Sequence, residues 1–240
     1  MDQKFTIDLS PSCNTQIPDS LQQSLSAYGF DEAQRFFDTL STVYVLSVLL
    51  LLSAMAGVDL AATHQSRTMN FRLCDYHPDT AGPESSNGCG AHTDYGTFSI
   101  TFRDSTSGLE LEDADGHWTA APGDATVILT GWCALVLSGG RIQPARHQVR
   151  RVPGVRRVPG VRRVPGVRRL SAVLFVAPDV EAKLQPLDSR APVQAFSKRI
   201  LQGMTTDVGE FKEVMGKRWR YRGEVEEMEE DQLGKRRMMA

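Results

Sequence analysis

The sequence predicts a mainly β protein, an antiparallel β-sandwich or jelly roll with α-helices flanking it. From Thr68 onward, short runs rich in Thr, Phe, Ile, Leu and Val alternate with Gly, Asp and Pro, a pattern typical of short strands joined by turns. Before residue 67 and after Pro178 the apolar residues instead follow a helical period. The composition is 41% hydrophobic and 23% charged over 240 residues, which excludes a collagen, a coiled coil or a wholly disordered chain.

These patterns divide the chain into a helical N-terminal part (1–66), a β core (67–180) and C-terminal helices with a charged tail (181–240). The predicted strands are TMNFRLCDY, YGTFSITF, GLELED, GHWTA, DATVILT, CALVLS and RLSAVLFVAP. The predicted helices are a segment around Gln22–Thr39, an apolar segment Val43–Val58, and Val193–Met204 and Val208–Arg220.

The apolar segment Val43–Val58 is uncharged throughout but shorter than the roughly 20 residues that cross a bilayer. Asp38 and Asp59 flank it, and no Lys/Arg cluster anchors either end. We therefore interpret it as a buried helix that ends at Gly57, and we expect no membrane partner.

Cysteine usage indicates a protein of a reducing compartment, and we expect it in the cytoplasm. The start of the chain lacks a basic region followed by an apolar core, so no signal peptide is evident. The four cysteines form no CxxC pair, which argues against a disulfide framework or a zinc ribbon.

The formal net charge is only −2, yet ten arginines gather within residues 141–170.

Most of these arginines belong to VPGVRR, which occurs three times in tandem over residues 152–169. One interpretation is a basic arm that binds nucleic acid or another polyanion. The other is an expanded surface loop, since loops tolerate insertions at small thermodynamic cost. No aromatic residue is interleaved for base stacking, so the loop is favoured and no nucleic-acid partner is expected.

Three residues form a candidate metal site. His92-Thr-Asp94 leads into the run YGTFSITF, and residues two apart on a strand project from the same face. His147, at another strand-like run, is the third candidate. Two histidines and one carboxylate leave three metal positions open, which suits non-haem Fe(II) and O2 chemistry, although zinc also uses such ligands. A second His-x-Asp pair, His77-Pro-Asp79, lies in a Pro/Gly-rich loop unsuited to strand pairing.

The order of several motifs resembles the iron(II)- and 2-oxoglutarate-dependent dioxygenases, in their isopenicillin-N-synthase-like branch. The matching pieces are the HxD of His92 and Asp94, the distal His147, and the Arg-x-Ser of Arg169 and Ser171, while FRLCDYHP resembles the family's RLxxYP strand with Tyr76 as its tyrosine. The resemblance covers roughly residues 68–180. Removing two copies of the repeat restores the family's spacing of about ten residues between the distal histidine and this arginine.

The resemblance implies a double-stranded β-helix (jelly-roll) fold and an enzyme with Fe(II) and 2-oxoglutarate as cofactors. His92, Asp94 and His147 would bind the metal, and Arg169, Ser171 and Tyr76 the far carboxylate of 2-oxoglutarate. With O2, such an enzyme oxidises a small molecule by hydroxylation, desaturation or cyclisation. Only residues 1–91 precede the HxD, which implies a shortened N-terminal region.

Two alternatives remain open at this point. The same iron ligands can serve an oxidase without 2-oxoglutarate, in which Arg169 and Ser171 hold the substrate's own carboxylate. The chain can also be a non-catalytic basic binding module on a decayed oxygenase fold, with the arginine repeat as its binding element.

Overall fold

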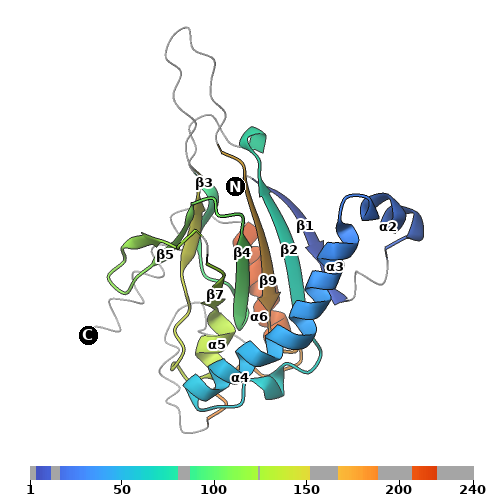
Figure 1. The fold of residues 1–240 in the computed structure, drawn as a ribbon. Helices are drawn as coiled ribbons and strands as arrows, with labels where there is room; N and C mark the ends of the chain where they lie inside the picture. Colours follow the sequence, from blue (N-terminus) through green and yellow to red (C-terminus); the bar gives the residue numbers. More distant parts are fainter. Residues whose placement is uncertain are drawn as a thin grey trace.

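The computed structural model describes residues 4–11, 17–80, 87–123, 125–151, 167–188 and 207–220. These residues form two antiparallel sheets that face each other, which confirms the predicted jelly-roll class (Figure 1). The major sheet has the order β1 (Phe5–Leu9), β2 (Met69–Tyr76), β9 (Arg169–Val176), β4 (Phe98–Arg103) and β7 (Val127–Thr130). The minor sheet has the order β3 (Asn87–His92), β8 (His147–Arg150), β5 (Leu109–Glu112) and β6 (Trp118–Ala120).

The space between the sheets is filled by buried side chains from both of them. Cys74 and Tyr76 of β2 pack against Cys89, Leu109 and Val149 of the minor sheet. The register of β2 against β9 pairs Cys74 with Ser171 and Tyr76 with Arg169. Because alternate side chains of a strand share a face, these four side chains point into the same interior.

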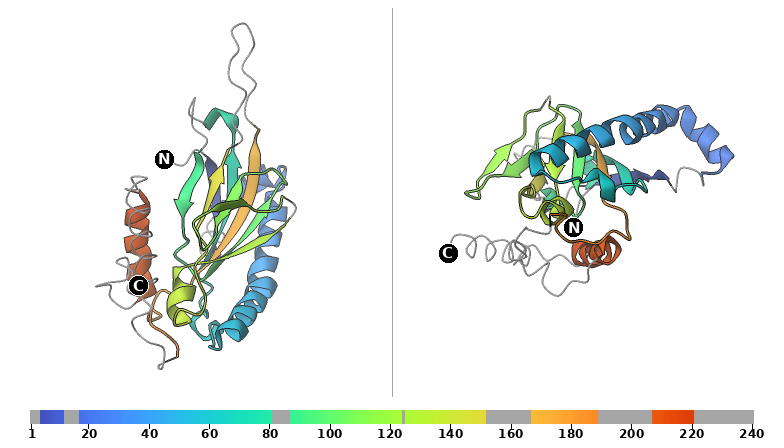
Figure 2. Two further views of the ribbon diagram at one scale, coloured as in Figure 1. Left: turned by 90° about the vertical axis from the view of Figure 1, so that its left-hand side faces the viewer. Right: turned by 90° about the horizontal axis from the view of Figure 1, so that it is seen from below.

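The opposite face of the major sheet carries a helical layer. α3 (Phe30–Thr39), a π-helical turn η1 (Leu40–Tyr44) and α4 (Val45–Ala56) run on from one another and pack on β2, β9 and β4. Phe37 stacks on Phe71 with ring centroids 5.9 Å apart. The last helix, α6 (Val208–Arg220), lies on the other side of the sheets (Figure 2).

Of the two predicted N-terminal helices, the first is interrupted in the structure and the second ends where predicted. The helix expected around Gln22–Thr39 is broken at Gly29, where φ is +82°, so that α2 (Asp19–Ser26) precedes α3. The helix predicted over the apolar segment ends at Gly57 as expected, with φ +66°, a backbone conformation that glycine adopts without strain.

The prediction that this apolar helix is buried is only half right. Val45, Leu49 and Leu52 are buried against the sheet, whereas Leu50 and Met55 are 55% and 70% exposed. The sequence pattern does not distinguish the buried positions from the exposed ones, because this helix carries apolar residues on every one of its sides. The continuous helical run Phe30–Ala56 is long and apolar enough to cross a membrane by length and composition, with 33% of its most apolar stretch buried.

One predicted strand is in fact a helix. The run CALVLS lies in α5 (Trp132–Leu137), whose side chains are all buried. A short apolar run does not reveal by its pattern whether it is a strand or a buried helix, and here tertiary contacts decide. The amides of Trp132 and Cys133 donate to the carbonyls of Asp94 and Tyr95 at 3.0 and 3.1 Å, and α6 covers the helix through Phe211.

The remaining predictions concern the C-terminal helices and the VPGVRR repeat. Val208–Arg220 is helical as predicted, whereas Val193–Met204 and most of the VPGVRR repeat lie outside the described residues. The family's spacing of about ten residues predicts a short hairpin between the strands on either side of the repeat. β8 and β9 instead belong to different sheets, so they do not pair with each other as a hairpin.

Gly131 fixes the close approach of α5 to the segment that carries Asp94. A β-carbon at this position would overlap the carbonyl oxygen of Gly96 and lie 2.6 Å from that of Asp94. We expect Gly131→Ala to lower the free energy of unfolding by about 1–3 kcal/mol, a drop in Tm of several degrees, measured by thermal denaturation.

Gly216→Ala in α6 is the matched control. A β-carbon there meets no atom within 4 Å, and alanine is the better helix former by about 1 kcal/mol. Equal melting temperatures for the Gly131 variant and the wild-type protein would show that α5 can move away without cost.

Candidate metal centre

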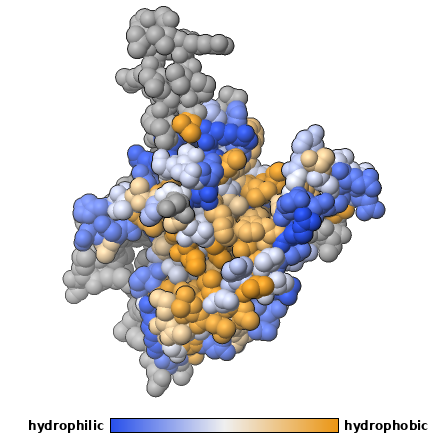
Figure 3. Space-filling model, in the orientation of Figure 1, coloured by the Kyte–Doolittle hydropathy of each residue, from blue (hydrophilic) through white to orange (hydrophobic). Residues whose placement is uncertain are grey.

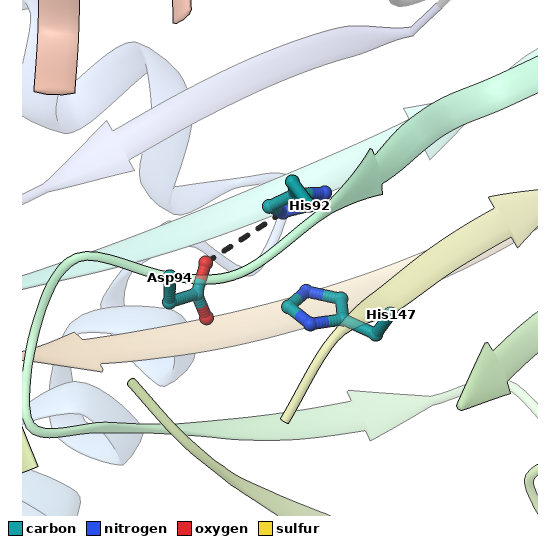
Figure 4. Close-up of side chains that lie close together, drawn as sticks. All are labelled: His92, Asp94 and His147. Carbon is teal, nitrogen blue, oxygen red and sulfur yellow. Dashed lines mark ion pairs between the residues drawn. The ribbon is translucent and has the colours of Figure 1, made fainter. Parts of the chain in front are cut away.

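The three predicted metal ligands come from adjacent strands of the minor sheet. His92 ends β3, His147 begins β8, and the two are register partners, with ring centroids 4.2 Å apart. Asp94 follows in the loop that leads to β4. One ligand atom from each residue lies within 4.8 Å of the others, and the side chains point toward one another (Figure 4).

Hydrogen bonds to the backbone orient both rings. Nδ1 of His92 lies 2.7 Å from the carbonyl oxygen of Gly90, and Nδ1 of His147 lies 3.1 Å from that of Ala145. Each Nδ1–H donates to its carbonyl in the tautomer that leaves Nε2 with a free lone pair. Carbonyls in this position commonly orient histidines that bind metals.

The carboxylate of Asp94 is oriented in the same way. Ser99 Oγ donates to its Oδ2 at 2.7 Å, while Oδ1 lies 3.6 Å from Nε2 of His92. The side chains of His92 and Asp94 are only 9% and 10% exposed. Two imidazole nitrogens and one carboxylate oxygen thus share a buried site, and this donor set fits a divalent transition metal such as Fe(II).

Electrostatics in the metal-free site favour one proton on His92. Burial opposes charge on that ring, but the facing Cys89 sulfur and the Asp94 carboxylate outweigh it and raise the pKa of His92 to about 10. Burial and the neighbouring His92 lower the pKa of His147 to about 4. Burial also opposes charge on Asp94, yet the two histidines hold the pKa of its carboxyl well below the usual range. These shifts favour a neutral His147 and a protonated His92 beside the Asp94 carboxylate.

Metal binding is therefore expected to release about one proton, because His92 must be neutral to bind a metal. Below the pKa of about 10, the fraction of neutral His92 rises with pH, so the affinity for Mn(II) should increase up to about tenfold per unit between pH 6.5 and 8.5. Calorimetric titrations in buffers of different ionisation enthalpy measure the proton count. Binding without proton release would contradict the protonated state assigned to His92.

Arg169 lies in the same interior and is the second notable feature of the site. It is 4% exposed, and its Nη1 donates to Ser171 Oγ at 3.3 Å. Its guanidinium carbon lies 5.1 Å from the centroid of the Tyr76 ring. Its Nε has no hydrogen-bond partner, and no carboxylate among the described residues pairs with it. The only compensation seen among the described residues is with the exposed Asp104, whose pKa the charge of Arg169 helps to lower. A poorly compensated buried charge is costly, so this arrangement favours an anionic ligand.

Tyr76 completes the set of predicted site residues. It is buried, and burial raises the pKa of its phenol, so the hydroxyl keeps its proton and acts as a hydrogen-bond donor. A small cavity adjoins Tyr76 and Arg169, lined also by Ser107 and Val149. The structure thus brings Tyr76, Arg169 and Ser171 together in the interior between the two sheets.

Sequence reasoning missed three residues around this site. Ser99 lies within a predicted strand with no motif to mark it. Lys4 Nζ donates to Cys89 Sγ at 3.4 Å, and that sulfur lies 3.9 Å from Nδ1 of His92. Lys4 belongs to the N-terminal segment, far from any motif, so only the folded chain reveals its place.

A second His/Asp cluster does not resemble the first. Asp113, Asp115 and His117 are exposed in the turn between β5 and β6, and the Asp113 carboxylate accepts the amides of Asp115 and His117. It provides a matched control for experiments on the buried centre.

The fold and the buried centre together define a double-stranded β-helix protein with two histidines and one carboxylate in its interior. Residues 65–178 match the model of the 2OG-Fe(II) oxygenase superfamily. This stretch of the chain is therefore similar to oxygenases that use Fe(II) and 2-oxoglutarate.

Known proteins are similar over part of their length. A feruloyl CoA ortho-hydroxylase of Ipomoea batatas is 28% identical over 124 residues, which are 50% of this chain and 35% of that protein. A full-length Neurospora crassa protein, solved in complex with alpha-KG, superposes with a TM-score of 0.63 at 18% identity, covering 92% of this chain and 66% of that one. A dioxygenase for auxin oxidation from Arabidopsis thaliana, solved with 2-oxoglutarate, gives 0.54 at 21% identity, covering 79% and 70%.

These structural likenesses show the fold. The chain spans about one third of the length of the curated relative and about two thirds of each solved structure.

Proposed function

We propose that this chain is an Fe(II)- and 2-oxoglutarate-dependent oxygenase that oxidises a small organic molecule by hydroxylation, desaturation or cyclisation. One observation carries the proposal: the buried Arg169 guanidinium, which forms no ion pair with any carboxylate in the described part of the chain, lies in the same interior as two histidines and an aspartate whose ligand atoms lie within 4.8 Å of one another. The guanidinium suits the far carboxylate of a dicarboxylic keto acid, and the two histidines with the aspartate suit a metal ion. Oxygenases of the 2OG-Fe(II) superfamily use both a keto acid and a metal.

In this proposal His92, Asp94 and His147 hold Fe(II), and the metal together with 2-oxoglutarate supplies the activation of O2, with succinate and CO2 as co-products. The chain's own residues bind and orient. Gly90, Ala145 and Ser99 hold the ligand atoms in place through the hydrogen bonds described above.

Arg169 offers its planar fork to the far carboxylate of 2-oxoglutarate, and Ser171 and Tyr76 supply further hydroxyl donors. The apolar side chains of Leu109 and Val149 lie in the same interior. They exclude water, which strengthens the pairing between the guanidinium and the carboxylate.

The test is an anaerobic titration of the purified chain with Fe(II) and 2-oxoglutarate. We expect a weak visible absorption band that needs both additions, and slow release of succinate when air is admitted without a substrate. If folded protein binds the metal but shows neither band nor succinate, the 2-oxoglutarate assignment is wrong and the oxidase-type alternative replaces it. If folded protein binds no metal, the proposed function fails and a non-catalytic binding module replaces it.

A further inference from the structure

A continuous apolar surface covers the outside of the helical layer. The outward-facing side chains of α4 and the turn before it are large, apolar and about half exposed or more: Val43, Tyr44, Leu46, Leu50, Leu51 and Met55. No charged residue occurs from Leu40 to Val58. A surface helix normally carries polar residues on its outer side, so α4 presents to solvent the kind of surface that proteins usually cover.

The same surface extends onto the major sheet beyond the helices. Phe5 and Ile7 of β1, Ile128 of β7 and Leu170 of β9 are between 43% and 62% exposed. They lie on the helix-covered side of the sheet, since Leu9 and Leu174, on the same strand faces as Ile7 and Leu170, pack in the core with α4. Figure 3 shows apolar residues gathered over the lower and central parts of this side of the molecule, with some polar residues between them. We call the α4 and sheet residues together the apolar face.

The extent of the apolar face matches a protein interface. A side chain of this size that is half exposed leaves on the order of 80 Å² in contact with water. The six side chains of α4 and its preceding turn therefore present roughly 500 Å², and the whole apolar face, including the sheet residues, roughly 800 Å². The largest patch on a typical monomer is about 300–600 Å², whereas each partner in a standard stable interface buries about 800 Å².

The charges around the face argue against an anionic membrane as its partner. Helices that lie on such membranes carry Lys and Arg along their polar side. Here the exposed charged residues at the two ends of the helical layer are Glu32, Asp38 and Asp59, with Arg35 and Arg141, which pair with Glu32 and Asp188. Arg168, beside Leu170 of the face, is likewise paired, with Asp75. The basic residues at this border are thus neutralised by carboxylates and form no cluster that would attract negative lipid headgroups.

We propose that the apolar face is the interface of a homodimer, in which α4 of one copy packs against α4 of the other about a two-fold axis. A neutral apolar surface is complementary to itself, as such an interface requires. The small residues Ser47 and Ala54 lie two turns apart on the exposed side of α4, where they allow two helix backbones to approach closely.

Sedimentation velocity of the full chain over a concentration series tests the proposal. We expect twice the 26.5 kDa chain mass for the wild-type protein, and the single-chain mass for Leu50→Glu, because both copies would bury a charge. Leu21→Glu, at a similarly exposed leucine on α2, should keep the dimer. Thermal unfolding shows whether each variant is folded.

Ser47→Cys adds an independent readout. Both proteins are compared in a Cys13→Ser background, because Cys13 lies outside the described residues. Across a two-fold axis at α4, mild oxidation should link two copies of the Ser47→Cys variant into a covalent dimer, while the background protein, whose remaining cysteines are all buried, should not be linked. A single-chain mass for the wild-type protein at all concentrations overturns the proposal. If the single-chain protein then floats with neutral phosphatidylcholine vesicles, the apolar face binds lipid instead of a second copy.

Discussion

Asp94→Ala is expected to abolish metal binding at the buried centre. The substitution removes the only anionic ligand and leaves two neutral nitrogen donors. Substitutions that merely disturb the orientation of ligands typically cost 10- to 100-fold in metal affinity, so the loss of a ligand should weaken Mn(II) binding by more than about 100-fold. Calorimetry, or the paramagnetic resonance of free Mn(II), measures this loss.

The exposed cluster in the β5–β6 turn controls for non-specific effects. Asp115→Ala removes a carboxylate from a group of similar composition, and it should leave tight Mn(II) binding unchanged. Asp94→Asn keeps the size of the side chain and should behave like Asp94→Ala if the charge is what matters. If folded Asp94→Ala protein still binds Mn(II) tightly, the metal site does not depend on Asp94 and lies elsewhere in the chain.

Arg169→Met is expected to abolish 2-oxoglutarate binding while leaving metal binding intact. Removing one partner of a buried charge pair at a binding site costs about 2–5 kcal/mol, so the affinity for 2-oxoglutarate should fall by roughly 30- to several-thousand-fold. Calorimetric titration of the Mn(II)-loaded protein with 2-oxoglutarate measures the change.

The same variant makes a prediction about stability. In the ligand-free protein the Arg169 guanidinium is buried without a carboxylate partner among the described residues, so its replacement by an apolar side chain of similar length should leave the free energy of unfolding unchanged or higher. Arg168→Ala is the matched control, since Arg168 is exposed and pairs with Asp75. A marked fall in Tm for Arg169→Met, with 2-oxoglutarate affinity unchanged, would assign Arg169 a structural role.

The sequence determined the class of fold and the candidate site to a large extent. Alternating strand patterns and turn residues depend on local properties of the chain, so the jelly roll was predictable. The spacing of His92 and Asp94, and the order of His147, Arg169 and Ser171 after them, singled out the residues that the structure brings together. These features are local in sequence or ordered along it, and no distant contact is needed to detect them.

Tertiary structure alone decided the rest. CALVLS forms a helix because its first amides meet the carbonyls of Asp94 and Tyr95, and α4 is half exposed because one side of an evenly apolar helix happens to meet the sheet. The protonation of His92 depends on how the folded chain places Cys89 and Asp94 around the ring. The position of Lys4 depends on its contact with Cys89, 85 residues further along the chain. The physical reason is the same in each case: burial and hydrogen bonding are properties of the assembled interior, and a local pattern of residues does not contain them.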